Sequence, residues 1–553
     1  MHRLSDRFLL LLLLLSVAGC GSLGQTLDEF AELVVSGGEQ RLREPMRPIR
    51  GHARVLMIAL DGVSEDQLRD ALADGDLPSL SELVGPESEH GVYERGYFAP
   101  DVVSAFPAET SVGWATVFTG ASPAETGVTG NEWFDRHERV VYAPVPLSVG
   151  TVEQTLSIWS DGLFGEQIQA PTLFEQAGVR SHVSMGFVYR GADLLTPPDL
   201  NDLSDLIDGA FDMLFGGIDE LYEELDQDTW EGFERGADRY GIPDLQVAYF
   251  PGVDLVAHES GREEQRRYMR DEIDPHIDRI LARYRRDGLL RDTYVFVVSD
   301  HGHVETRDED RNSLSGDGMD EPRALLDSLG YRVRTSTVAE VDEDFDLVMV
   351  YNEAAASIYL ADRSTCREPG DDCDWRKPPR IEEDVRPLVD QLYHAAFDSS
   401  ALGGLPGALD LILARASDPS GETYPPFQVV TRDGWVGVDD YLSANPRPDL
   451  ARFAERLDWL TNGPFGHHAG DVILLARSGD DVPLADRYYF GSPRVSGHGG
   501  ASAGESHISF LLAHPNATGD ELRDLMHTQI GPTPTQRDAT PLVLRLLEQP
   551  PRR

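Results

Sequence analysis

The chain has almost no lysine and few basic residues for its size. Lys377 is the only lysine, and 96 acidic side chains against 48 basic ones give a formal net charge of -48. Proteins bind DNA or RNA mainly by neutralising phosphates with Lys and Arg, so we expect no nucleic-acid polymer as a partner. A polybasic membrane surface is excluded for the same reason. Salt adaptation and a GC-rich genome would both produce this composition, and the sequence does not separate them.

Long hydrophobic runs are missing as well. The longest, Phe8–Leu15, is about half of the roughly 20 residues that span a bilayer. It follows Arg3 and Arg7 and precedes small residues ending at Cys20. This pattern resembles a bacterial lipoprotein signal, in which residues 1–19 are removed and Cys20 is lipidated; an ordinary cleaved signal peptide is the alternative. We then expect a polar tether over 20–50 and export to the periplasm or cell surface, with Gly21 favouring the outer membrane.

Cysteine is scarce: the chain has three, and only Cys366 and Cys373 remain beyond the export signal. They flank an acidic loop that contains proline. In an oxidising compartment such a pair typically forms a disulfide that closes the loop. A metal site there has less support, because no neighbouring histidine would complete it.

Apolar residues make up 41% of the 553 positions, enough for a large core. Continuous apolar runs at 54–60, 245–250 and 294–299 predict strands buried on both faces. They alternate with helical patterns, so we expect an α/β fold with a mostly parallel central sheet and helices on both faces. The expected core comprises 51–302 and 491–549. Residues 303–490, loop-rich up to 345, would form a mixed insertion bordering the site.

Carboxylates and histidines follow the ends of these strands. Asp61 ends the first, Asp254 and His258 follow the second at a helical i,i+4 spacing, and Asp300 and His301 end the third. A further histidine, at position 498, stands among glycines. Singly, each is typical of a turn or an exposed surface. Together, Asp and His ligands without cysteine indicate a catalytic zinc or manganese-like site.

These motifs, in this order, resemble the alkaline phosphatase superfamily, and within it the nucleotide pyrophosphatase/phosphodiesterase (type I phosphodiesterase) branch. The branch motif Phe-Pro-x-x-Thr is Phe106 to Thr110 here, and Asn131 follows a Gly-rich turn at the family's spacing. The residues after the threonine, Ser111 to Trp114, depart from the branch. That departure leaves nucleotide specificity open. The formylglycine motif of the related sulfatases is absent from this position.

The resemblance implies an alkaline-phosphatase-like fold with two divalent metal ions, zinc being the expected metal. Their ligands would be Asp254, His258 and His498 for one ion, and Asp61, Asp300, His301 and the Thr110 oxygen for the other. Thr110 would attack phosphorus and form a phosphothreonine that water then hydrolyses. Asn131 and the Ser111 backbone N–H would bind a non-bridging oxygen. Ser111 as the nucleophile, and Asn131 as a mere turn residue, remain open alternatives.

The expected substrate is a small phosphate ester, most plausibly a phosphodiester or nucleotide pyrophosphate. A phosphomonoesterase, a phosphoryl transferase and a non-catalytic surface binding module remain as alternatives. Other histidines have simpler interpretations. His303 could touch substrate or be solvated, His467 and His468 suit a capped turn better than a third metal, and His507 suits a structural role.

Overall fold

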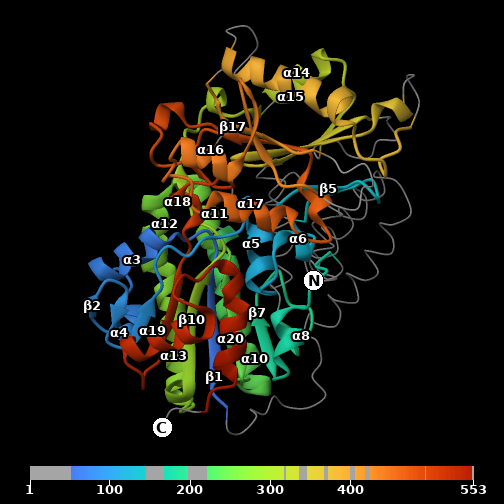
Figure 1. The fold of residues 1–553 in the computed structure, drawn as a ribbon. Coiled ribbons are helices and arrows are strands. Elements are labelled where there is room, and N and C mark those ends of the chain that lie inside the picture. The colour runs from blue at the N-terminus through green and yellow to red at the C-terminus, as the bar shows by residue number, and fades with distance from the viewer. Residues whose placement is uncertain are drawn as a thin grey trace, which may run out of the picture.

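Nine strands form one sheet in the lower half of the molecule (Figure 1). The computed structural model describes residues 52–144, 167–196, 221–316, 319–335, 345–366, 372–398, 405, 407–416, 424–491 and 494–550. The sheet order is β2-β3-β4-β22-β10-β1-β9-β7-β8. The strands are β1 Arg54–Leu60, β2 Glu87–Glu89, β3 Val92–Tyr93, β4 Gly96–Phe98, β7 Ser181–Ser184, β8 Leu194–Thr196, β9 Leu245–Phe250, β10 Thr293–Ser299 and β22 Phe510–Ala513.

The centre of this sheet is parallel. β1 pairs in parallel with both β9 and β10, and β7 does so with β8 and β9. The mostly parallel centre predicted from the sequence is therefore confirmed. Beyond β10 the chain adds an antiparallel edge made of β22, β4, β3 and β2. Because the parallel strands share one direction, their carboxyl ends lie along a single edge of the sheet.

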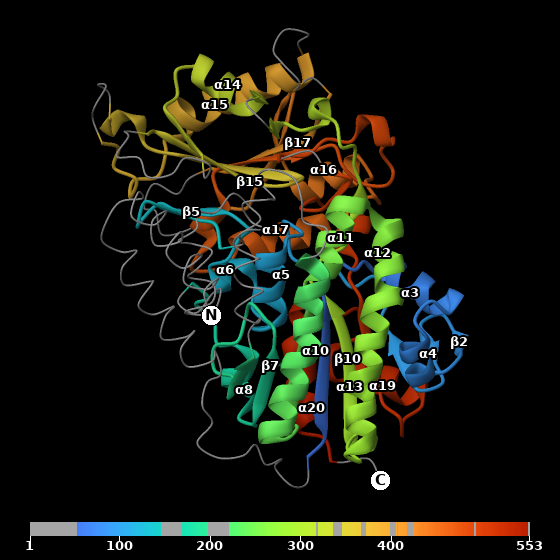
Figure 2. The ribbon, with the colours of Figure 1, turned by 180° about the vertical axis from the view of Figure 1, so that it is seen from behind.

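Alternating side chains of β1 explain why both faces are covered. Val55, Met57 and Ala59 belong to one hydrophobic core, and Leu56 and Ile58 to the other. Helices α5, α8 and α20 pack on the first face, where Figure 1 shows α20 in front of β1. Helices α3, α4, α10 and α13 pack on the second face, seen in Figure 2. These helices are α3 Glu65–Asp74, α4 Pro78–Val84, α5 Thr110–Val117, α8 Leu173–Ala177, α10 Leu221–Tyr240, α13 Asp274–Arg286 and α20 Ala539–Leu547.

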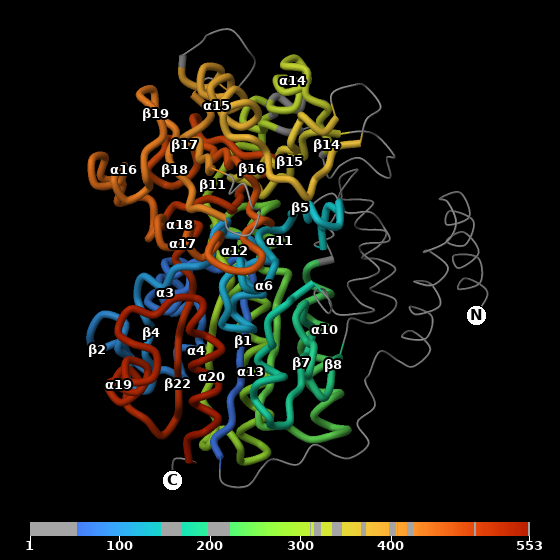
Figure 3. Tube along the Cα trace, turned by 45° about the vertical axis from the view of Figure 1, so that its right-hand side comes forward, coloured from blue at the N-terminus to red at the C-terminus, as the bar shows by residue number. Residues whose placement is uncertain are grey.

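A second sheet lies above the first (Figure 3). Its order is β14-β15-β16-β20-β17-β18-β19, and only β14 and β15 pair in parallel within it. The strands are β14 Val333–Thr335, β15 Leu347–Asn352, β16 Ala355–Leu360, β17 Leu409–Ala414, β18 Gln428–Thr431, β19 Gly434–Gly437 and β20 Val472–Ala476. All of them come from the 303–490 segment that the sequence assigns to an insertion.

Helices cover both faces of the second sheet. Helices α14 (Glu321–Ser328) and α15 (Arg386–Tyr393) pack on its outer core. Helix α17 (Phe453–Thr461) belongs to the inner core, which also contains Phe106 and Ala501. These two residues flank the segments that carry Thr110 and His498. The inner face of the second sheet therefore packs directly against the segments that carry candidate site residues.

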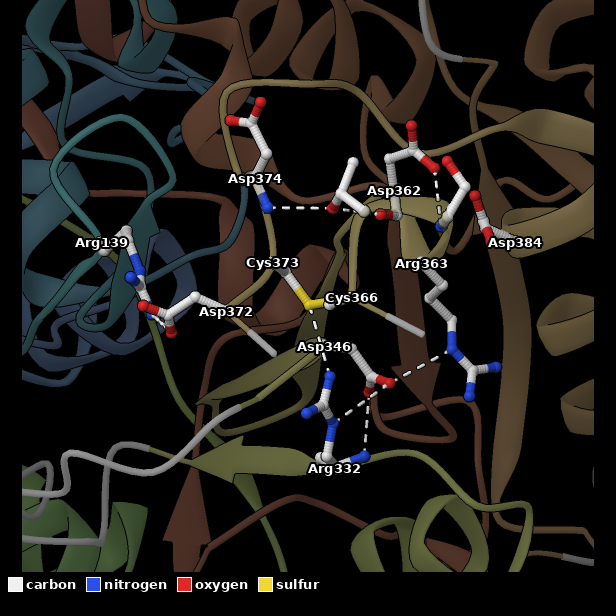
Figure 4. Close-up of a disulfide and its surroundings, with 12 residues drawn as sticks. Arg139, Arg332, Asp346, Asp362, Arg363, Cys366, Asp372, Cys373, Asp374 and Asp384 are labelled. Atoms are coloured by element: carbon white, nitrogen blue, oxygen red, sulfur yellow. Dashed lines mark hydrogen bonds and ion pairs between the residues drawn. A yellow bond between two sulfur atoms is a disulfide. The ribbon is translucent and has the colours of Figure 1, made fainter. Parts of the chain in front are cut away.

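The 303–490 segment, called the second region below, contains a disulfide bond, Cys366–Cys373 (Figure 4). Cys373 Sγ accepts a hydrogen bond of 3.5 Å from Arg332, and Asp346 accepts from Arg363 at 3.2 Å. Buried Trp375 packs in the same cluster. The bond therefore joins Cys366 and Cys373 at the edge of the second sheet, among ion pairs and aromatic contacts.

One local expectation differs from the structure. Helix α14 begins at Glu321, inside the region that the sequence predicts to be loop, because its apolar residues pack against the second sheet. The export signal, Cys20 and the tether lie outside the described residues. None of the described helices is both long enough and apolar enough to cross a bilayer.

Candidate active site

The candidate ligands meet at the carboxyl-terminal edge of the parallel strands. Asp61 directly follows β1 and Asp300 directly follows β10, while Asp254 lies in the first turn of α11 (Gly252–Ser260), just after β9. β1 lies between β9 and β10. The three carboxylates, which are far apart in the sequence, therefore come from three adjacent strands.

One set of donor atoms combines Asp254, His258 and His498. The Nε2 atoms of His258 and His498 lie 3.1 Å apart, and those atoms lie 3.3 and 3.8 Å from the Asp254 carboxylate oxygens. Both histidines donate their Nδ1–H groups to backbone carbonyls, of Ser496 and Ala108, at 3.0 Å. This pattern fixes the tautomer and leaves both Nε2 lone pairs turned toward the same point, as in metal-binding histidines.

The second set combines Asp61, Asp300, His301 and Thr110. His301 Nε2 lies 3.2 Å from Thr110 Oγ1, 3.3 Å from Asp300 Oδ2 and 3.6 Å from Asp61 Oδ1. Those two carboxylate oxygens are buried and have no hydrogen-bond partner among the described residues. Buried acceptors without partners are costly, so the pair fits a bound cation. The donor set of oxygens and imidazoles suits zinc or manganese.

The pKa shifts of the buried ligands also favour a bound cation. Burial, with a contribution from Asp254, raises the pKa of Asp61 to about 7, and burial raises the pKa of Asp300 well above its usual range. Burial lowers the pKa of His301 and of His498 well below the usual value, so both imidazoles are neutral. Uncompensated carboxylates beside neutral imidazoles form a site that a divalent cation would stabilise.

Backbone contacts place Thr110 against the second set. Gly62, with φ of 64°, donates its N–H to Asp300 Oδ1 at 3.0 Å. Gly113, in the first turn of α5, comes so close to Asp300 that a Cβ there would lie 2.7 Å from the Asp300 Cβ. A side chain at 113 would push the start of α5 away. The tight packing thus brings Thr110, the first residue of α5, to the ligands.

Comparison with known proteins assigns the chain to a family. The family model for type I phosphodiesterase / nucleotide pyrophosphatase matches residues 55–450, which is more than half of the chain. The chain belongs to this family. The family takes its name from phosphodiesterase and nucleotide pyrophosphatase activities. His498 lies beyond the matched range, so its inclusion in the site rests on the geometry above.

Individual relatives are distant. The chain is 24% identical over 255 residues to "Ectonucleotide pyrophosphatase/phosphodiesterase 2" of Saccharomyces cerevisiae, covering 45% of this chain and 47% of the relative. It is 27% identical over 256 residues to an uncharacterised pyrophosphatase/phosphodiesterase of Schizosaccharomyces pombe, covering 46% and 45%. The chain therefore spans less than half the length of these curated relatives.

Two solved structures are also similar over most of their length. Murine ectonucleotide pyrophosphatase/phosphodiesterase 5 aligns with a TM-score of 0.47 at 14% identity, over 89% of this chain and 95% of that one. Phosphonoacetate hydrolase from Sinorhizobium meliloti 1021 aligns with a TM-score of 0.48 at 16% identity, over 91% and 97%.

Asn131 lies beside the nucleophile candidate of this phosphodiesterase family member. Its Oδ1 accepts the Ser111 backbone N–H at 2.8 Å, and its Nδ2 donates to buried Glu109. The Ser111 N–H is thus directed at Asn131, not at a free point in the site. Ser111 itself is fully buried. Of the two hydroxyls, that of Thr110 lies at the ligand cluster.

His303 is a site residue that sequence reasoning did not place. It is fully buried, and its Nε2 donates to Asp254 Oδ1 at 2.6 Å while its Nδ1 lies 3.0 Å from Ser496 Oγ. It is not solvated, and its ring instead contacts the Asp254 carboxylate and the Ser496 hydroxyl. Its position two residues after His301 is a signal that could have suggested this role.

Glu353 was missed because it comes from the second sheet, in the turn between β15 and β16. Its Oε2 accepts the His498 backbone N–H at 2.9 Å, and its Oε1 lies 3.7 Å from His258 Nε2. Arg494 lies 3.7 Å from the same Oε1. Only the tertiary packing of the second sheet over the first brings this carboxylate to the site.

Proposed function

We propose that the protein is a metal-dependent hydrolase of phosphate esters that prefers phosphodiesters or nucleotide pyrophosphates. Family membership supports phosphate-ester hydrolysis. The observation that carries the mechanism is the position of Thr110 Oγ1, 3.2 Å from His301 Nε2. It lies beside the carboxylates whose free oxygens fit a cation.

Thr110 is the proposed nucleophile. When bound by the two ligand sets, divalent metals, zinc above all, would supply positive charge that acidifies the Thr110 hydroxyl and stabilises the leaving oxygen. The Thr110 oxygen, having lost its proton, forms a bond to phosphorus as the ester P–O bond breaks. The leaving alkoxide takes a proton from solvent, and water then cleaves the phosphothreonine, restoring the threonine and releasing the phosphate product.

Asn131 and the start of α5 would stabilise the charge on phosphate. Thr110 is the first residue of an eight-residue helix, where unpaired backbone N–H groups and the helix dipole favour an anion. Asn131 has a second amide hydrogen besides the one directed at Glu109. We propose that this N–H donates to a non-bridging oxygen, and that bound phosphate also competes for the Ser111 N–H.

Charge near the site supports a diester over a monoester. Glu353 adds a carboxylate on the His498 side, and Arg494, which could offset its charge, lies 3.7 Å from its Oε1. A monoester dianion carries one negative charge more than a diester and would meet more repulsion here. A nucleotide substrate agrees with one family structure, an inactive variant of murine ectonucleotide pyrophosphatase/phosphodiesterase 5 in complex with AMP.

The test compares hydrolysis of bis-p-nitrophenyl phosphate and p-nitrophenyl phosphate by the purified protein, with and without added zinc. We expect zinc-dependent turnover with the diester preferred. Preference for the monoester would keep the site but make the enzyme a phosphatase. Activity on neither, with zinc bound, would favour a phosphoryl transferase or a surface binding module.

We also propose export as a lipoprotein anchored through Cys20, on the strength of the N-terminal sequence alone. Replacing Cys20 with Ala should release the protein from the membrane fraction of the expressing bacterium. Retention of that variant in membranes would contradict the anchor.

A further inference from the structure

A second group of histidines and a carboxylate lies apart from the residues of the active site. It consists of Asp135, at the end of β5 (Trp133–Asp135), and His467 and His468, in the 3-10 turn Gly466–Ala469. One potential ligand atom from each lies within 4.8 Å of the others. β5 belongs to the segment after Asn131, and the turn directly precedes β20 of the second sheet. The group therefore joins the two regions of the molecule.

Hydrogen bonding sets the state of His468. Its Nδ1 lies 2.6 Å from the Gly127 carbonyl oxygen, which can only accept, so Nδ1 carries the hydrogen. Its Nε2 lies 3.2 Å from Asp135 Oδ2. A neutral His468 would thus turn a lone pair toward a carboxylate. The contact requires a positive charge, either a second proton on the imidazole or a cation between the two groups.

His467 favours the cation. It is 6% exposed, and its Nδ1 is buried without a hydrogen-bond partner among the described residues. A buried polar atom without a partner is costly, and His467 is grouped with a carboxylate and a second imidazole, so the group suits a cation.

Nearby positive charges are accounted for by other contacts. Arg136 forms a buried ion pair of 2.7 Å with Asp471, and Arg415 donates to the Gly466 carbonyl at 2.9 Å. Among the contacts of the described residues, neither guanidinium forms an ion pair with Asp135. His137, whose exposed ring packs 4.7 Å from that of His467, could add another ligand.

We propose that Asp135, His467 and His468 bind a divalent transition-metal ion of their own, with zinc the best match. One carboxylate and two imidazoles suit zinc better than calcium or magnesium, which prefer oxygen ligands. Water or His137 would complete the coordination. The backbone around this site also contacts the segment leading to Asn131, since Thr129 Oγ1 donates to the His468 carbonyl at 2.9 Å. The metal would therefore hold that segment against the second sheet.

Metal analysis of the purified protein tests this proposal. We expect His467→Gln and Asp135→Asn each to lose about one zinc ion per chain relative to the wild type. His527→Gln is the matched control, because His527 is a partly buried histidine whose Nε2 contacts Tyr97 OH. It should keep the wild-type zinc content. His498→Gln should instead lower zinc at the active site, so the two sites are distinguished.

A measurement on the wild-type protein tests the proposal even if the variants fail to fold. Crystals grown with zinc should show an anomalous-scattering peak between Asp135 and His468, apart from any peaks at Asp61 or Asp254. Unchanged zinc content in both variants, or no such peak at full occupancy of the active site, would overturn the proposal. The contact would then be an imidazolium–carboxylate ion pair.

Discussion

The two sheets contribute to the candidate site in different ways. The first sheet supplies Asp61, Asp254 and Asp300 at or just beyond the ends of buried strands, where backbone pairing fixes their spacing. The second sheet supplies Glu353 from a turn, at a place set by side-chain packing between the regions. We infer that the first sheet carries the chemistry common to the family, while the second adjusts which phosphate ester fits.

The largest expected effect is a loss of turnover when the proposed nucleophile, at the site of the first sheet, is removed. We expect Thr110→Ala to lower kcat by on the order of 10³-fold or more, because the substitution removes the hydroxyl that lies 3.2 Å from His301 Nε2. Zinc content should stay close to that of the wild type, since Asp61, Asp300 and His301 remain. Steady-state kinetics and metal analysis on the same preparation check this.

Ser111→Ala is the matched control, because Ser111 is the neighbouring hydroxyl and its Oγ is buried without a hydrogen-bond partner among the described residues. It should keep activity within a few-fold of the wild type. Loss of turnover in Ser111→Ala together with an active Thr110→Ala would assign the nucleophile to Ser111.

The next largest effect concerns Asn131. Removing a donor to the charge that develops on phosphate typically costs roughly 10²- to 10³-fold in kcat. We expect Asn131→Ala to show such a loss, with a smaller change in KM and no change in zinc content. A turn residue without a catalytic role would instead give a variant with near-normal kcat and a lower melting temperature.

Sequence reasoning located the residues of the first sheet for a physical reason. A continuous apolar run such as 54–60 predicts a strand buried on both faces, and the polar residue that ends it must lie at the sheet edge. Asp61, Asp254 and Asp300 follow such runs, so their convergence could be predicted from local pattern alone. The i,i+4 spacing of Asp254 and His258 likewise fixes both on one face of α11.

The remaining residues could not be predicted, because their positions depend on long-range packing. Such packing leaves no pattern among neighbouring residues of the sequence. Glu353 is an ordinary acidic residue in a hairpin until the second sheet packs over the first. His303 looked like an exposed neighbour of His301, and only the fold buries it against Asp254. Asp135 and His468 are 333 positions apart, so the sequence favoured a capped turn at His468 over a metal site.

Glu353→Gln tests the contribution of the second sheet. It should change the preference for diester over monoester more than it changes kcat. The substitution removes one negative charge near His258 and His498 while keeping an oxygen that can accept the His498 backbone N–H. We expect the ratio of diester to monoester kcat/KM to fall by about tenfold, because the extra charge of a monoester meets less repulsion. The two p-nitrophenyl substrates report this ratio directly.

Glu263→Gln, an exposed substitution on helix α12 (Arg262–Tyr268), changes the net charge equally and is the control. Its ratio should match the wild type. An unchanged ratio in Glu353→Gln would assign Glu353 to the support of His498 alone and would leave selectivity to other residues.

The smallest effect on catalysis should come from the disulfide, which lies within the second region and contacts no candidate ligand. The double substitution Cys366→Ser and Cys373→Ser removes the bond between two cysteines that are seven positions apart in the sequence. Loop-closure entropy grows with loop length, so this short loop should contribute about 2 kcal/mol to the free energy of unfolding. Thermal melts should show the loss, while kcat and the selectivity ratio remain unchanged. A change in selectivity without a change in kcat would mean that the position of Glu353 depends on this distant edge of its sheet, and the second region would then act as one rigid unit on the substrate.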